Sequence, residues 1–185
     1  MTASLHPPLG APRRPDLRFL LAHPAHLVAL GFGAGLSRWA PGTVGTLWAW
    51  AAFLVIDAAL GAGPGRDLAW ALLLTAGTVI GWWACTLTAR HLGVADPGAI
   101  VWDEVLAFWA ILWLLMPAGL AGQGVAFALF RFFDAAKPGP VAWADAFFKR
   151  RRFGAGIGWA QGFGILFDDA VAALCTLLVI ALWRF

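Results

Sequence analysis

The sequence feature that most constrains the fold is an apolar segment near the C-terminus that contains two adjacent carboxylates. Asp168 and Asp169 are followed by mostly apolar residues as far as Trp183. A charged side chain at the centre of a bilayer costs roughly 2.5–3.5 kcal/mol on insertion scales, and intramembrane acids commonly mark functional sites. The pair therefore needs a compensating partner, which the rest of the chain has to supply.

The composition of the whole chain is that of a membrane protein. Of its 185 residues, 61% are hydrophobic and 12% are charged, whereas soluble domains are roughly half apolar and a quarter charged. The sequence predicts an all-α polytopic membrane helix bundle with about five spans, some of them short or re-entrant. The 13 basic residues outnumber the 10 acidic ones. In a membrane protein this excess marks the cytoplasmic side and anionic lipid, not nucleic acid.

The chain divides into a proline-rich tail and one membrane domain. Residues 1–18 carry four prolines and several arginines, which predicts a disordered basic tail, and residues 19–185 form the helical domain. Residues 19–36 predict a short interfacial or re-entrant helix. The expected spans are 44–60, 68–88, 103–117, 123–136 and 165–183, with polar loops at 90–102 and 138–162. We place His91 in the first of these loops, and the basic run Lys149–Arg152 in the second as an anchor on the lipid surface.

The basic residues also orient the chain. With five spans, nearly all of them fall on one side of the membrane, and only Arg66 and Arg184 fall on the other. The positive-inside rule then places the first side in the cytoplasm, with the N-terminus inside and the C-terminus outside.

This topology brings five carboxylates together at the cytoplasmic interface: Asp103, Glu104, Asp134, Asp168 and Asp169. Without partners they would repel one another. Arg131 and Lys137 flank Asp134, three residues away on either side, but two cations do not balance five acids. A hard divalent cation does, and oxygen ligands favour Mg²⁺, Mn²⁺ or Ca²⁺ over zinc. We therefore assign all five acids to a metal and catalytic site.

A bound phosphate would complete such a site. Mg²⁺ in proteins usually keeps positions for water and substrate phosphate, and Arg131 is the residue type best suited to grip phosphate with two donors. We assign Lys137, Thr43 and Thr46 to the same role. The glycine pairs Gly42/Gly45 and Gly162/Gly164 precede predicted spans, where a glycine-rich turn lets backbone N–H groups approach an anion. A purely structural role stays open for the Arg131–Asp134 pair, and for Asp168–Asp169 as a helix-dipole partner.

Four stretches, in order, resemble the phosphatidylglycerophosphatase A family. The first is Gly31–Ser37 with Pro41–Leu47, the second Ile100–Glu104, the third Phe130–Pro140 and the fourth Gly162–Asp169. The likeness covers residues from about 25 to 180. The chain departs from the family pattern at Ala107, where the family often has glycine, and at residues 150–161, which resemble an insertion.

The resemblance implies a specific reaction. Members of the family hydrolyse phosphatidylglycerophosphate to phosphatidylglycerol and phosphate, with Mg²⁺ as cofactor, at the inner membrane of bacteria. The implied partners are this lipid and the membrane, with no obligate protein partner. The sequence leaves open which acid acts as nucleophile or base. It also leaves two other functions open, a cation transporter or channel that uses the same acids and a non-catalytic lipid-binding scaffold.

Overall fold

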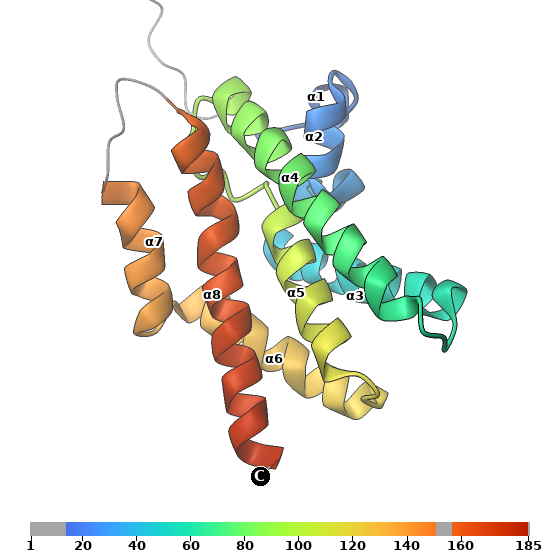
Figure 1. Cartoon of the computed structure of the whole chain (residues 1–185). Helices are drawn as coiled ribbons and strands as arrows, with labels where there is room; N and C mark the ends of the chain where they lie inside the picture. Colours follow the sequence, from blue (N-terminus) through green and yellow to red (C-terminus); the bar gives the residue numbers. More distant parts are fainter. Residues whose placement is uncertain (1–13, 151–156, 185) are drawn as a thin grey trace, which may run out of the picture.

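The computed structural model describes residues 14–150 and 157–184, and over these ranges the chain folds into helices joined by loops (Figure 1). This confirms the all-helical prediction. The elements in order are α1 (Leu17–Leu21), α2 (Pro24–Ala29), η1 (Gly31–Leu36), α3 (Pro41–Leu60), α4 (Arg66–Leu92), α5 (Trp102–Leu115), α6 (Leu120–Ala136), α7 (Pro140–Arg150) and α8 (Trp159–Arg184).

Three of the described helices are long and apolar enough to cross a membrane, namely α3, α4 and α8. The sequence predicted about five spans. The difference arises at α5 and α6, which have 14 and 17 residues and rise only about 21 and 25 Å at 1.5 Å per residue. The hydrocarbon core of a bilayer is about 30 Å thick.

The long helices expose apolar side chains on their outer faces. Val55 on α3 is 70% exposed, Val79 on α4 63% and Leu182 on α8 80%. Apolar surface on this scale is unfavourable in water. These faces are suited to contact lipid, as expected for a membrane protein.

Helix α5 forms the centre of the bundle, between α8 on one side and α3 and α4 on the other (Figure 1). Ten of its 14 residues are buried, and a helix that is apolar all round belongs in a protein interior. Two indole groups fix it to its neighbours. Trp109 donates to the Ala49 carbonyl of α3 at 2.8 Å, and Trp102 donates to the Gly77 carbonyl of α4 at 3.0 Å.

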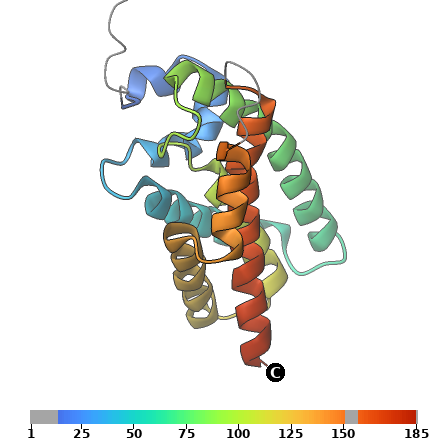
Figure 2. The same ribbon diagram turned by 90° about the vertical axis from the view of Figure 1, so that its left-hand side faces the viewer.

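Helix α8 begins at Trp159, not at residue 165, and so Gly162 and Gly164 lie inside a helix instead of in an anion-binding turn. A Cβ atom added at Gly162 would lie 1.8 Å from Thr86 Oγ1 of α4, and one at Gly164 would lie 2.6 Å from Phe148 Cβ of α7. These glycines allow α8 to pack closely against α4 and α7. Figure 2 shows α7 running beside α8.

Two further boundaries differ from the sequence prediction. Helix α3 begins at Pro41, not at residue 44, because proline suits the first turn of a helix, where its missing N–H has no partner to lose. The predicted loop 138–162 contains α7. Residues 151–156, which include part of the basic run and of the suspected insertion, lie outside the described residues.

The N-terminal helices pack on the end of α4. Residues 1–13 of the predicted tail lie outside the described residues, but Leu17 already begins α1, capped by Asp16. His26 of α2 lies 2.7 Å from the Phe19 carbonyl through Nδ1 and 2.7 Å from His91 Nδ1 through Nε2. His91 lies in the last turn of α4, and not in a loop as the sequence predicted.

The close contact at Gly162 generates a stability prediction. Gly162→Ala should destabilise the protein by about 1–3 kcal/mol, because the new methyl group overlaps Thr86 and the two helices must separate. The measurement is thermal unfolding in detergent. Gly124→Ala in α6 is the matched control, because its Cβ would meet only Trp50 at an ordinary 3.7 Å. Equal melting temperatures for the two variants would contradict this packing.

Candidate active site

Three carboxylates from two helices form the centre of the site. Asp103 and Glu104 lie in the first turn of α5, and Asp169 lies nearly three turns into α8. One oxygen atom from each of the three lies within 4.8 Å of the others. The crossing of α5 and α8 thus gathers residues that are 65 positions apart in the sequence.

One oxygen of each of these acids lacks a hydrogen-bond partner within the described part of the chain. The atoms are Asp103 Oδ1, Glu104 Oε2 and Asp169 Oδ2, and all three are buried. Glu104 as a whole is only 9% exposed and Asp169 only 3%. Buried polar atoms are nearly always satisfied, and a buried unpaired charge is costly. Carboxylate oxygens are the ligands that a hard divalent cation takes, so this cluster could hold a metal ion.

Arg131 connects this centre to Asp134 on α6. Its guanidinium Nη1 lies 2.5 Å from Asp134 Oδ2 and 3.8 Å from Glu104 Oε1. Arg131 and Asp134 are three residues apart on one helix face, which places them in contact. A guanidinium has five N–H donors, so this contact leaves several donors for another anion.

Lys137 forms a second charged group directly after α6. Its ammonium lies 2.6 Å from Asp168 of α8 and 2.5 Å from Asp145 of α7. Burial alone would lower the pKa of Lys137, but its hydrogen bonds to Asp145 and Asp168 outweigh burial and raise the pKa above its usual value. The lysine is therefore held as a cation, and it joins three helices.

The structure thus divides the five predicted acids into two kinds. Asp103, Glu104 and Asp169 share one space and have unpartnered oxygens, whereas Asp134 and Asp168 are each paired with a cation. Asp145 is a sixth acid near the site that we did not predict, because its segment was assigned to a loop. Buried Val141 and Ala144 are three residues apart, a helical spacing that is a signal for α7.

The two predicted threonines are placed differently. Thr46 is fully buried and its hydroxyl donates to the Gly42 carbonyl at 2.8 Å, whereas Thr43 is only partly buried in the first turn of α3. Gly42 itself lies against the charged groups. A Cβ atom there would be 2.3 Å from Glu104 Oε1 and 3.1 Å from both terminal nitrogens of Arg131. The absence of a side chain at position 42 is what makes room for this pair.

Long apolar helices around an acidic centre, flanked by an arginine and a lysine, define a helical membrane protein with a cluster of acids that could hold a metal ion. The model of the family "Phosphatidylglycerophosphatase A" matches residues 27–184. The chain belongs to this family. It is a phosphatase of phospholipid metabolism, which confirms the prediction of an enzyme and favours it over the transporter and the scaffold.

Individual relatives agree with this assignment. The phosphatidylglycerophosphatase A of Escherichia coli is 35% identical over 169 residues, which cover 88% of this chain and 87% of that protein. The Haemophilus influenzae protein of the same name is 34% identical over 167 residues, or 90% and 92% of the two chains. A Bacteroides thetaiotaomicron protein described as a candidate phosphatidylinositol-3-phosphatase is 33% identical over 163 residues, or 85% and 92%. No solved structure matches the chain significantly.

The position of Gly42 leads to a prediction about activity. Gly42→Ala should displace Glu104 and Arg131 and lower phosphatase activity roughly 10–100-fold, because misplacement of charged groups by about 1 Å has effects on this scale. The measurement is phosphate release by protein whose melting temperature has been checked. Gly63→Ala, where the added Cβ meets nothing within 4 Å, is the control and should keep wild-type activity. Full activity of Gly42→Ala would show that the close contact of position 42 with Glu104 and Arg131 does not matter for activity.

Proposed function

We propose that the chain hydrolyses phosphatidylglycerophosphate to phosphatidylglycerol and phosphate in a Mg²⁺-dependent reaction at the cytoplasmic face of the bacterial inner membrane. The observation that carries the proposal is the set of three buried, unpartnered carboxylate oxygens at Asp103, Glu104 and Asp169, beside Arg131. Family membership supports the lipid substrate.

In this proposal Asp103, Glu104 and Asp169 hold Mg²⁺. Bound there, Mg²⁺ neutralises phosphate charge and lowers the pKa of a bound water. The fit rests on the donor set, since three oxygens that lie within 4.8 Å of one another are of the type that Mg²⁺ prefers.

The cationic side chains bind and orient the phosphate. Arg131 keeps donors free after its contact with Asp134, and its planar fork matches two phosphate oxygens. Lys137 has three N–H donors, two of which point at Asp145 and Asp168, so the third serves the phosphate. Thr43 is the more accessible of the two threonines for a further contact. One of the acids at the site acts as nucleophile or as the base that takes a proton from water.

The membrane positions the lipid for this reaction. In this proposal the site faces the side of the membrane to which the positive-inside rule assigns the cytoplasm. A lipid phosphomonoester in the cytoplasmic leaflet presents its headgroup at that depth. Short α5 and α6 allow the site to lie near the interface instead of at the bilayer centre.

The metal assignment predicts which substitutions abolish activity. Asp169→Asn and Glu104→Gln should each lower Mg²⁺-dependent phosphate release about 100-fold or more, as expected when a preorganised charged group is lost at a site of phosphoryl transfer. Asp168→Asn and Asp134→Asn should also lower the rate, because each releases a cation that orients phosphate. Asp67→Asn is the control, since its side chain is 77% exposed and lies in the first turn of α4.

Two measurements complete this test. Mg²⁺ should raise the melting temperature of the wild-type protein and of Asp67→Asn but not of Asp169→Asn, and a chelator should stop phosphate release. The substrates are phosphatidylglycerophosphate, phosphatidic acid and phosphatidylinositol 3-phosphate. Near-normal activity of Asp169→Asn and Glu104→Gln, or full activity with chelator, would refute the proposed site.

A further inference from the structure

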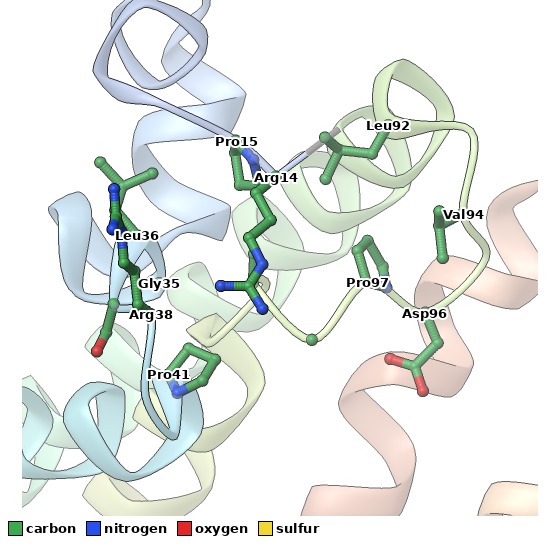
Figure 3. Close-up of a pocket in the computed structure, with 13 residues that line it drawn as sticks. Arg14, Pro15, Gly35, Leu36, Arg38, Pro41, Leu92, Val94, Asp96 and Pro97 are labelled. Carbon is green, nitrogen blue, oxygen red and sulfur yellow. The ribbon is translucent and has the colours of Figure 1, made fainter. Parts of the chain in front are cut away.

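A cavity of about 380 Å³ opens beside the acidic centre, between η1, the start of α3 and the loop that joins α4 to α5 (Figure 3). The lining residues on which the argument depends are Arg14, Gly35, Arg38, Pro41, Asp96 and Ala99. Ligand sites in proteins commonly have volumes of about 300–1,000 Å³, so this cavity has room for a small polar group.

The walls of the cavity are held in place by backbone contacts. A Cβ atom at Gly35 of η1 would lie 2.0 Å from the Ala99 carbonyl oxygen, so η1 and the α4–α5 loop touch without a side chain between them. The Val101 N–H donates to the Ala29 carbonyl at 2.9 Å. The cavity is therefore preformed, which reduces the entropic cost of binding a ligand.

The charges at the cavity favour an anion. Arg14 and Arg38 both line it, and neither guanidinium forms an ion pair with another of the described residues. Figure 3 shows the end of the Arg14 side chain between Pro41 and Pro97, with Asp96 on the far wall. Two exposed arginines against one acid, at the edge of a recess lined mainly by apolar residues, are suited to bind a phosphate group.

The cavity adjoins the acidic centre at two points. Pro41 lines the cavity, and the next residue, Gly42, lies against Glu104 and Arg131. On the opposite wall, Asp96 is close enough to Asp168 for their charges to interact. A ligand that occupied both spaces would therefore carry two anionic groups a short distance apart.

We propose that this cavity binds the internal phosphodiester of the lipid headgroup, through Arg14 and Arg38, while the terminal phosphomonoester lies at the acidic centre. The proposal rests on the proposed function and adds to it a basis for substrate choice. A lipid with a diester and a monoester joined by a short polyol contacts both spaces. Phosphatidic acid, whose single phosphate is the monoester, leaves the cavity empty.

The first experiment compares two lipids with the same acyl chains. For Arg38→Gln and Arg14→Gln, kcat/KM for phosphatidylglycerophosphate should fall at least about tenfold more than kcat/KM for phosphatidic acid, since loss of one charge-assisted contact is commonly worth a factor of ten. The loss should appear mainly as a higher KM. Arg18→Gln, an exposed arginine of α1 outside the cavity, controls for general attraction to anionic lipid and should keep the wild-type ratio.

The second experiment measures binding without turnover. Short-chain phosphatidylglycerol, which has only the diester, should bind the wild-type protein and Arg18→Gln but bind Arg38→Gln about tenfold more weakly. Inorganic phosphate, which competes for the acidic centre, should bind all three proteins alike. This arm separates the two proposals, because it tests the cavity even if the wild type releases no phosphate from either lipid, the result that refutes the proposed function.

Several outcomes would overturn the inference. If Arg38→Gln lowered kcat/KM equally for both lipids, the arginine would act on the monoester or on folding. If both arginine variants kept the wild-type ratio of kcat/KM for the two lipids, the cavity would not bind the diester. Equal binding of phosphatidylglycerol to the wild type and to Arg38→Gln would refute the site directly. Arg38→Lys, which keeps the charge but not the planar fork, should give an intermediate ratio.

Discussion

The structure depends on the convergence of three carboxylates, two of them buried and the third half-buried, where α5 crosses α8. Asp103, Glu104 and Asp169 each keep an oxygen that no other described residue satisfies, and buried unpaired charges cost several kcal/mol each. Such an arrangement requires packing that enforces it, and in our proposal Mg²⁺ compensates the carboxylates. The packing is supplied by α5, which is buried on most of its surface and tied to α3 and α4 through Trp109 and Trp102.

Two groups of ion pairs, one around Arg131 and one around Lys137, lie beside this centre. Arg131 joins Asp134 to Glu104, and Lys137 joins Asp168 to Asp145. Each cation is oriented by an acid, and in our proposal each keeps an N–H donor for phosphate. The acids at the site therefore have different roles. Three are available to a metal, and three others position or accompany the cations. In our further proposal, the arginine-lined cavity next to Gly42 binds a second phosphate group, so that the enzyme would contact one headgroup at two places.

Much of the fold class and of the candidate site was predictable from local sequence signals. Composition and the length of apolar segments predict helices in a membrane, because the backbone must satisfy its own hydrogen bonds there. The three-residue spacing of Arg131 and Asp134 predicts their contact on one helix face. The excess of acids over cations in the motifs predicts a metal, and the order of the four motifs predicts the family. None of these signals requires knowledge of how one helix crosses another.

Sequence alone therefore determined the helical class and the family, and it predicted the charged residues of the candidate site except Asp145, because these depend on residue type and short-range spacing. Tertiary structure decided which acids share one space, since the approach of α5 to α8 depends on contacts between residues 65 positions apart. It also decided that Gly162 and Gly164 serve helix packing, that Asp145 accompanies Lys137, and that only three described helices are long enough to span a membrane. The physical reason is the same in each case. Close approach between helices is set by the side chains of both partners, and local periodicity reports only one of them.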